Sequence, residues 1–547
     1  MMAQNVHLSR DLYKAQWTNA NVDVIVQYKQ GPTSVQQQRA ARFGGTFRKH
    51  LGLINARAYS VPAANLDAFA ADPDVAYIAP DRKVHMLLDN TAAAVQAVAA
   101  WSSGLDGTGI GVAVIDSGIS DHGDLQGPNG SRIVFRDNFV GSDAADHFGH
   151  GEHVAGIIGG NGGASQCLIC SRTFKGIAPN VNLLDLRVLD ENGEGSDSTV
   201  IAAIQEAIQL KDQYNIRVIN LSVGRPVFES YTTDPLCQAV EAAWNAGIVV
   251  VVSAGNDGRV NAANNNGYGT ISAPGNDPYV ITVGAMKSMG THDRSDDMVA
   301  SYSSKGPTQI DHVVKPDIMA PGNQVVSLQS PDGVLQSLYP QNVVLTNYYQ
   351  WTQKGQTSPD YFMLSGTSMA APVVSGAVAL LLQSHPTLTP DQVKARLMRT
   401  AYKVLPRTSV AQDPITGQSF TSEYNIFTVG AGYLDIQAAL ADGTPFWGGA
   451  HSPTVVQVGS GSGYQGGAVM ACDSSTICFY GRYWWVWNTQ SIWGDQSVWG
   501  DQSIWGDQSI WGDQSIWGDQ SIWGDQSIWG DQSIWGDQFS ISINGEQ

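Results

Sequence analysis

The sequence has few cysteines, few charged residues and few basic residues for its length. Cysteine accounts for 5 of 547 residues, and 14% of the residues are charged, with 30 Lys and Arg against 49 Asp and Glu. A net charge of −19 argues against a nucleic-acid-binding protein, because phosphates require clustered basic side chains. No uninterrupted apolar run reaches the length of a membrane span, so we expect a soluble protein without a transmembrane segment.

The first twenty residues are polar and contain no apolar segment of the kind that directs secretion. Two alternatives stay open on this evidence. The protein is intracellular, or it is secreted with a signal that this sequence does not contain.

The cysteines fall into two close pairs and one single residue. Cys167 and Cys170 form a Cys-x-x-Cys in a loop of small residues, and Cys472 and Cys478 flank a short polar stretch. A zinc site would need two more ligands, and a redox motif would need a thioredoxin-like context. We see neither and therefore expect two local disulfides, with Cys237 left as a buried thiol on a helix. An oxidising compartment suits this arrangement.

A turn of small residues, 364–372, leads into an apolar helix with Ser368 at its beginning. The free N–H groups and the dipole at a helix N-terminus favour negative charge developing nearby. Considered alone, Ser368 is more typical of an ordinary helix cap than of a catalytic group.

Two segments upstream change that interpretation. Asp116 ends a run of mainly β-branched residues, which is typical of a buried parallel strand, and carboxylates at such strand ends are often functional. His150 and His153 open another apolar helix, and their spacing, His-Gly-Glu-His, differs from the metal-binding motif His-Glu-x-x-His. The order Asp116, His150, Ser368 matches the triad order of subtilisin.

These segments resemble the three signature blocks of the subtilisin-like serine proteases, and the resemblance extends from about residue 101 to residue 440. It implies that Asp116 is the orienting aspartate, His150 the general base and Ser368 the nucleophile. A serine hydroxyl needs such a base beside it to act as a nucleophile. Glu152 stands where the family usually has threonine. We expect it to add a charge beside the base.

The resemblance also implies the groups that bind the substrate and the oxyanion. Asn256, in the segment Ser-Ala-Gly-Asn-Asp-Gly, matches the family's side-chain oxyanion donor, although an asparagine beside glycine is also a common turn residue. The second donor would be the backbone N–H of Ser368. The implied substrate-binding residues are Ser222, Val223, Gly224 and Gly255. Glycines leave space, which implies a broad preference for large apolar side chains before the scissile bond.

The alternation of strand-like and helix-like segments predicts an α/β fold with a doubly wound parallel sheet, preceded by a small α+β domain that resembles an inhibitory propeptide. The alternative for that domain is an accessory unit that stays attached. The predicted organisation is a polar segment (1–20), a propeptide-like domain (21–88), an exposed processing linker (89–100), a catalytic domain (101–441), a linker rich in Gly, Ser and aromatic residues (442–490) and a repeat tail (491–547).

The tail carries eight tandem hexapeptides over 491–538, seven of them Ser-Ile-Trp-Gly-Asp-Gln and one with Val498. An even period places the same residues on the same side of an extended chain, so exposed tryptophans could mediate attachment to a cell surface or a polymer. A low-complexity, mostly disordered tail is an equally good interpretation.

Calcium is common in the family that the sequence resembles, but catalysis there needs no cofactor. We assign no calcium ligands: four aspartates lie in plausible loops, and we expect them to be solvated, namely Asp143, Asp146, Asp296 and Asp297.

The sequence therefore predicts a secreted or cell-surface serine endopeptidase made as a zymogen, acting on protein or peptide substrates and inhibited by its own propeptide. The alternative is a surface- or polymer-binding protein whose repeat tail carries the function. An esterase or a peptide ligase with the same triad is a third possibility.

Overall fold

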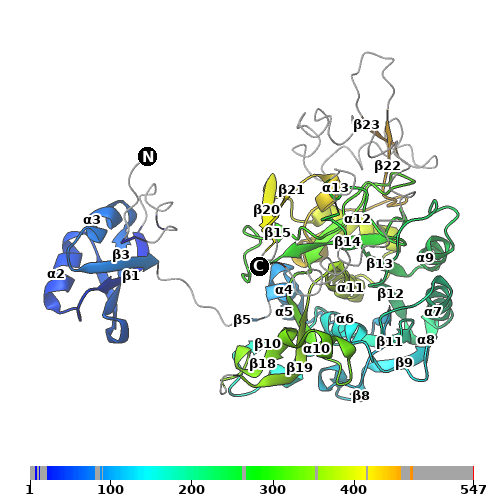
Figure 1. The fold of residues 1–547 in the computed structure, drawn as a ribbon, viewed down its shortest axis with the longest axis horizontal. Coiled ribbons are helices and arrows are strands. Elements are labelled where there is room, and N and C mark those ends of the chain that lie inside the picture. Colours follow the sequence, from blue (N-terminus) through cyan, green and yellow to red (C-terminus); the bar gives the residue numbers. More distant parts are fainter. Residues whose placement is uncertain are drawn as a thin grey trace, which may run out of the picture. The chain divides into compact units, whose positions relative to one another are not determined.

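A computed structural model describes residues 21–80, 87–88, 90–260, 266–351, 355–413, 417–457 and 468–471, together with residues 7, 8, 12 and 546. The chain divides into two compact units, Met1–Met86 and Leu87–Gln547 (Figure 1). The predicted disulfide of Cys472 with Cys478 and the hexapeptide repeats lie outside the described residues.

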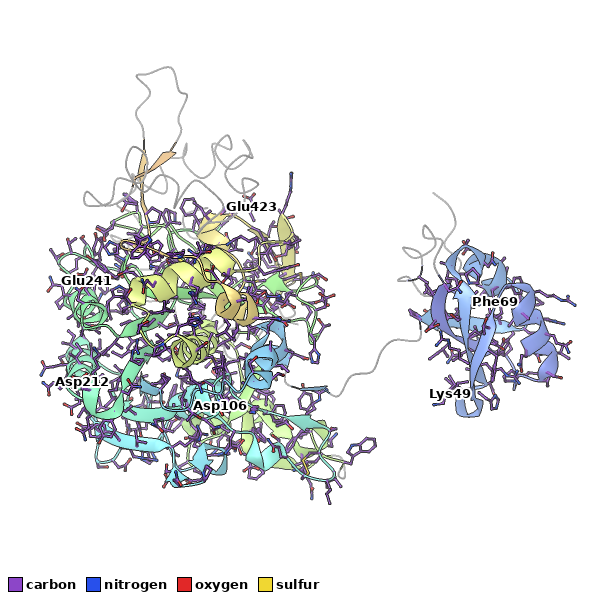
Figure 2. The ribbon with its side chains drawn as sticks, turned by 180° about the vertical axis from the view of Figure 1, so that it is seen from behind. Lys49, Phe69, Asp106, Asp212, Glu241 and Glu423 are labelled. Carbon is purple, nitrogen blue, oxygen red and sulfur yellow. A yellow bond between two sulfur atoms is a disulfide. The ribbon has the colours of Figure 1, made fainter. Side chains whose placement is uncertain are left out.

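In its described residues the first unit is an antiparallel sheet with the α-helices α2 and α3, as the α+β pattern predicts. Its strands lie in the order β2-β3-β1-β4. In β1, every second side chain from Val24 onward is buried, and Phe69, labelled in Figure 2, is buried with Tyr59. The elements are β1 (Asn21–Tyr28), α2 (Ser34–Arg42), β2 (Thr46–Leu51), β3 (Ala56–Pro62), α3 (Leu66–Ala70) and β4 (Val75–Pro80).

The second unit is built on an eight-stranded sheet in the order β15-β14-β13-β12-β6-β11-β9, with β16 beside β14. All pairs are parallel except β14 with β15. The doubly wound parallel sheet is thus confirmed. The strands are β6 (Gly111–Asp116), β9 (Ile133–Asn138), β11 (Asn182–Arg187), β12 (Ile216–Leu221), β13 (Val249–Ser253), β14 (Ile281–Lys287), β15 (Met298–Val299) and β16 (Ile318–Pro321).

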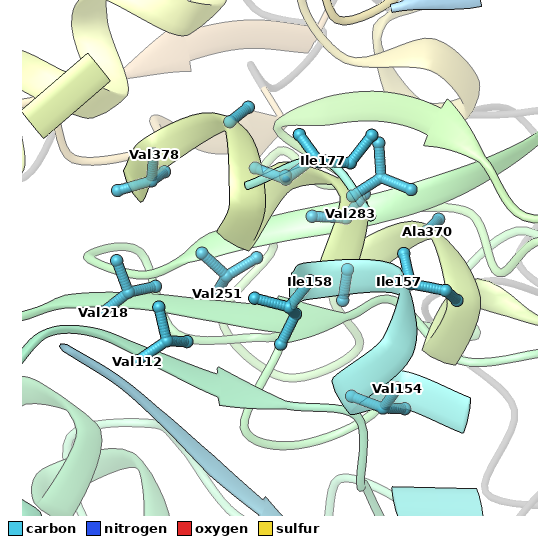
Figure 3. Close-up of a cluster of buried hydrophobic side chains, with 14 of the residues drawn as sticks. Val112, Val154, Ile157, Ile158, Ile177, Val218, Val251, Val283, Ala370 and Val378 are labelled. Carbon is cyan, nitrogen blue, oxygen red and sulfur yellow. The ribbon is translucent and has the colours of Figure 1, made fainter. Parts of the chain in front are cut away.

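Helices cover this sheet, and all six residues of β6 are buried. Because successive side chains of a strand point to opposite faces, such burial requires cover on both faces. Val112, Val218 and Val251 point toward α6 and α11, which also pack against each other, as Figure 3 shows. The helices are α4 (Asn90–Ala94), α5 (Ala97–Ser102), α6 (His150–Gly159), α7 (Asp197–Gln209), α8 (Lys211–Tyr214), α9 (Pro235–Asn245), α10 (Val334–Leu338), α11 (Thr367–Ser384), α12 (Pro390–Thr400), α13 (Ile426–Val429) and α14 (Ile436–Ala441).

Smaller sheets complete the unit. The segment 326–363 contains α10 and most of an antiparallel sheet ordered β17-β19-β18. The strands are β5 (Leu87–Leu88) with β10 (Arg172–Thr173), β7 (Gln126–Gly127) with β8 (Gly130–Ser131), β17 (Val325–Leu328), β18 (Val343–Leu345), β19 (Thr357–Leu364), β20 (Thr408–Gln412) with β21 (Ser419–Glu423), and β22 (Thr454–Gln457) with β23 (Ala468–Ala471).

The helix α11 is the one described helix that is long and apolar enough to cross a membrane by length and composition. However, 83% of that stretch is buried inside the protein. Its side chains pack on β12, β13 and β14. This environment is that of a core helix in a globular unit.

Two predicted domain boundaries are wrong. The expected exposed linker 89–100 forms α4 and most of α5. Val95, between the two helices, and Ala97, the first residue of α5, are fully buried in the core of the second unit, because alanine-rich turns pack closely. The second unit also continues past residue 441. Ser452 is buried and accepts a hydrogen bond from Lys394 at 2.9 Å, and Val314 N donates to the Pro453 carbonyl at 2.8 Å.

The disulfide expected between Cys167 and Cys170 is present. Cys237 is a free thiol, fully buried on α9, as predicted. Burial raises the pKa of this thiol, which therefore stays protonated.

Candidate active site

Asp116 and His150 are joined at the point where β6 ends and α6 begins. Asp116 is the last residue of β6, and His150 is the first residue of α6. The His150 Nδ1 atom lies 2.7 Å from the Asp116 Oδ1 atom. The same Oδ1 atom accepts the backbone N–H of Ser117 at 2.8 Å, which fixes the orientation of the carboxylate. Asp116 is buried, whereas His150 is partly accessible.

This environment raises the pKa of His150. Burial opposes the charged imidazolium, but the charge of Asp116 and its hydrogen bond outweigh burial, and Asp146 adds a smaller effect of the same sign. The aspartate therefore stabilises a protonated histidine, as a general base requires when it holds a proton during a reaction.

Asp146 holds the first turn of α6, a role that the sequence analysis did not identify. Its Oδ1 atom accepts the Phe148 and Gly149 N–H groups at 3.1 and 2.7 Å and the Ser117 hydroxyl at 2.8 Å. Its Oδ2 atom accepts the Glu152 N–H at 2.7 Å. The side chain is fully buried, so the expectation that Asp146 is solvated is wrong. It fixes the helix end that carries His150.

Glu152 is fully buried as well, and its Oε2 atom accepts the Ser120 N–H at 2.6 Å. Burial, together with the charge of Asp146, raises the pKa of this carboxyl well above its usual range. We expected Glu152 to add a charge beside the base. The charges that raise the pKa of His150 are instead those of Asp116 and Asp146.

The second histidine of the pair, His153, is a structural residue. It is fully buried, with Nε2 3.1 Å from the Val325 carbonyl and 3.2 Å from the Phe362 carbonyl. Burial lowers its pKa to about 3, so the ring is neutral. These contacts tie α6 to the β17–β19 sheet.

Among the described residues, no group of three or more His, Cys, Asp or Glu side chains is arranged to hold a metal ion. Of the four aspartates considered for calcium, Asp143 and Asp296 are exposed, as expected for solvated groups. Asp297, like Asp146, is buried, and burial raises its pKa to about 7.

Ser368 lies in the first turn of α11, after Gly366, whose φ of 143° lies in the region that favours glycine. The Ser368 hydroxyl donates to the Ser222 carbonyl at 3.2 Å, and the Ser222 hydroxyl donates to the Ser368 carbonyl at 2.8 Å. Ser222 follows directly after β12. The end of β12 and the start of α11 are thereby joined, with Ser368 partly accessible.

Asn256 is oriented by Thr367, a residue that the sequence analysis did not single out. The Asn256 Oδ1 atom accepts the Thr367 N–H at 2.9 Å and the Thr367 hydroxyl at 3.2 Å. A Cβ atom at Gly366 would lie 3.3 Å from Asn256 Nδ2 and 3.6 Å from Ser368 N. Both nitrogen donors therefore border the small space that the missing side chain of Gly366 leaves.

Gly224 and Gly255 both lie against Ser272, which the sequence analysis also missed. A Cβ atom at Gly224 would lie 2.8 Å from the Ser272 Oγ atom, and one at Gly255 would lie 3.1 Å from the same atom. Gly224 is exposed, and Val223 and Gly255 are partly accessible. Gly224 and Gly255 therefore share Ser272 as a neighbour, and Ser222 contacts Ser368 directly. No sequence pattern points to Ser272, because its contacts with Gly224 and Gly255 join residues that are distant in the sequence.

Comparisons with known proteins identify the family to which this chain belongs. Residues 107–430 match the Subtilase family. Serine protease AprX from Bacillus subtilis (strain 168) is 35% identical over 373 residues, which cover 66% of this chain and 77% of that protein. Subtilisin E from the same organism is 33% identical over 400 residues, covering 72% of this chain and 83% of that protein.

The crystal structure of a cold adapted subtilisin-like serine proteinase shares 29% sequence identity with this chain, covering 55% of this chain and 85% of that one, with a TM-score of 0.38. The family match spans more than half of the chain, and both curated relatives are matched over more than two thirds of their length. The chain therefore belongs to the subtilase family and is a subtilisin-like serine endopeptidase.

Proposed function

We propose that Ser368 attacks the peptide carbonyl, with His150 as general base and Asp116 as the group that orients and stabilises the histidine. The observation that carries this assignment is the 2.7 Å contact between His150 Nδ1 and Asp116 Oδ1. With Nδ1 donating to the carboxylate, the Nε2 atom is left as the base. The helix α6, which starts at His150, packs against α11, which carries Ser368 in its first turn, and this packing supports the assignment.

In the first step, His150 removes the Ser368 hydroxyl proton while the oxygen attacks, and the carbonyl oxygen becomes an oxyanion. Asn256 Nδ2 and the Ser368 N–H, which border the space at Gly366, donate to this oxyanion. The imidazolium then protonates the leaving amine, and an acyl-enzyme remains. Water, activated by the same histidine, hydrolyses it and regenerates the serine.

Substrate specificity would arise beside the chain segment that follows β12. Ser222, Val223 and Gly224 would pair with an extended peptide, as an added strand pairs with a sheet edge. Gly224 and Gly255 carry no side chain beside this segment, which supports a broad preference for large apolar residues before the scissile bond.

We assign the first unit the role of an intramolecular inhibitor that is removed by self-processing. It has a core of its own, and the family of the second unit supports a zymogen. Burial of α4 and α5 moves the proposed cleavage site from the expected linker, 89–100, to the stretch between Pro80 and Leu87, because a cut within the helices would require them to unfold. This pathway, with the disulfide, favours secretion to an oxidising compartment or the cell surface.

Labelling with a serine-directed phosphonate tests the nucleophile. We expect one equivalent to bind and to map to Ser368, and Ser368→Ala to abolish both labelling and self-processing. Ser384→Ala, an exposed serine on the same helix, is the matched control and should behave as wild type. Labelling of another residue, or wild-type turnover in Ser368→Ala, would refute the assignment.

A further inference from the structure

Glu546, the penultimate residue of the chain, is buried in the second unit with 4% of its surface exposed. Its Oε1 atom accepts a hydrogen bond from Arg259 Nη2 at 2.8 Å and another from the Ser301 backbone N–H at 2.8 Å. The Ser301 hydroxyl donates to the same oxygen. Lys287 Nζ lies 3.4 Å from the other carboxylate oxygen. A carboxylate from the C-terminal end of the chain is therefore bound by a buried set of donors.

The Arg259 side chain is itself held in place for this contact. Its Nε atom donates to the Ser301 Oγ atom at 2.6 Å, and its Nη1 atom donates to Asp413 at 2.8 Å. The guanidinium lies 4.5 Å from the centre of the Phe420 ring. Three partners thus direct the remaining nitrogen, Nη2, at Glu546. A preorganised guanidinium is the usual receptor for a carboxylate in a buried site.

The backbone of Glu546 is bound as well, through one side chain. Asn323 Oδ1 accepts the Glu546 N–H at 2.8 Å, and Asn323 Nδ2 donates to the Glu546 carbonyl at 2.9 Å. This two-way contact fixes the direction of the chain and would form with any residue except proline. Arg259 and Ser301 add the requirement for a carboxylate.

The neighbours of Asn323 support the turn that carries the nucleophile. The Gly322 carbonyl accepts the Gly366 N–H at 2.8 Å, and the Gln324 N–H donates to the Ser365 hydroxyl at 2.8 Å. Glu546 is thereby linked through one residue to the segment that precedes Ser368.

We propose that Arg259, Ser301 and Asn323 form a receptor for the C-terminal end of this chain, with Glu546 as the anchoring residue. Thr454 of β22 pairs with Val313 of the second unit, and Glu546 is bound by Arg259 of the same unit. The hexapeptide repeats, 491–538, are therefore flanked in the sequence by two residues that the second unit binds, Thr454 and Glu546.

Amide hydrogen exchange on the full-length Ser368→Ala protein tests the anchor without self-digestion. The Ser301 N–H donates directly to Glu546. We therefore expect hydrogen exchange of the Ser301 amide to be at least about tenfold faster in Glu546→Gln, because removal of the carboxylate charge leaves the buried Arg259 guanidinium uncompensated. Glu191→Gln, an exposed glutamate, is the matched control and should change nothing. Equal exchange in both variants would overturn the proposal.

A second measurement does not depend on how the Glu546 variant folds. Carboxypeptidase Y applied to the native Ser368→Ala protein should remove Gln547 and stop, because the Glu546 backbone is bound by Asn323. After unfolding in urea and dilution into the assay, digestion should proceed into 539–545. Rapid removal of Glu546 and the residues before it from the native protein would overturn the anchor.

Discussion

Replacing Asp116 by asparagine tests how the charge at the end of β6 acts on the histidine. Both the Ser117 N–H and the His150 Nδ1 atom contact the same oxygen, Oδ1. An asparagine would keep its oxygen at that position, because its NH₂ group cannot accept the Ser117 N–H. The hydrogen bond to His150 and its tautomer would then be retained. The variant would remove the negative charge and place an NH₂ group at the buried position of Oδ2.

The magnitude follows from the separation of the charges. Two unit charges about 4 Å apart interact by about 4 kcal/mol at an effective dielectric constant of about 20. Because each 1.36 kcal/mol corresponds to about a tenfold change in rate, we expect kcat/KM to fall about 10³-fold. The pKa of His150 should also fall, because the imidazolium loses the charge that raises it.

The assay is the pH dependence of kcat/KM on a small chromogenic peptide. Wild-type activity should decline as the pH falls through the raised pKa of His150, since the protonated ring cannot act as a base. In Asp116→Asn the plateau should be lower and the decline shifted to lower pH. Asp212→Asn, at an exposed position on α8 labelled in Figure 2, is the control. A plateau within tenfold of wild type, or an unshifted decline, would refute the reasoning.

Three further predictions follow from the site and the C-terminal anchor. Asn256→Leu should lower kcat by about 10² to 10³ with little change in KM, a range that comes from subtilisin itself, a relative of this chain. An unchanged kcat would show that Asn256 does not belong to the oxyanion site. Gly224→Val should favour small over large apolar residues before the scissile bond, because its Cβ atom would lie 2.8 Å from the Ser272 hydroxyl. A peptide series that differs only at this residue measures the preference, and an unchanged order of kcat/KM values would show that Gly224 does not border the substrate side chain. Deleting the repeats 491–538 while keeping Glu546 should preserve hydrolysis of a small peptide and its thermal stability but reduce retention on cells or insoluble polymers. Deleting 491–547 should also lower the midpoint of thermal unfolding, so equal midpoints for the two deletions would contradict the anchor.

The main elements of the active site are predictable from local sequence. The β-branched run before Asp116, the apolar helix that starts at His150 and the small-residue turn before Ser368 each determine a strand end or a helix start through their own side chains. Short-range preferences of this kind act within a few residues, so the sequence alone displays them. Their order along the chain then indicates the family.

Strands with weak patterns escaped the sequence analysis. The strand β2, Thr-Phe-Arg-Lys-His-Leu, lacks a buried face, so no apolar alternation marks it, and it forms because β3 offers a partner. The alanine-rich segment of α4 and α5 was expected to be an exposed linker. Its small side chains become buried only through the core that the rest of the unit provides.

The sequence by itself determined the parallel α/β core and the residue types expected to react. Only the tertiary structure decided which polar groups orient them: Asp146 beneath the start of α6, Thr367 on Asn256, and Ser272 between Gly224 and Gly255. The same holds for Glu546, which meets Arg259 across 287 positions of the chain. Such contacts join residues that local pattern cannot relate, because the partners meet only when the chain has folded and both must be buried for their hydrogen bonds and charges to matter.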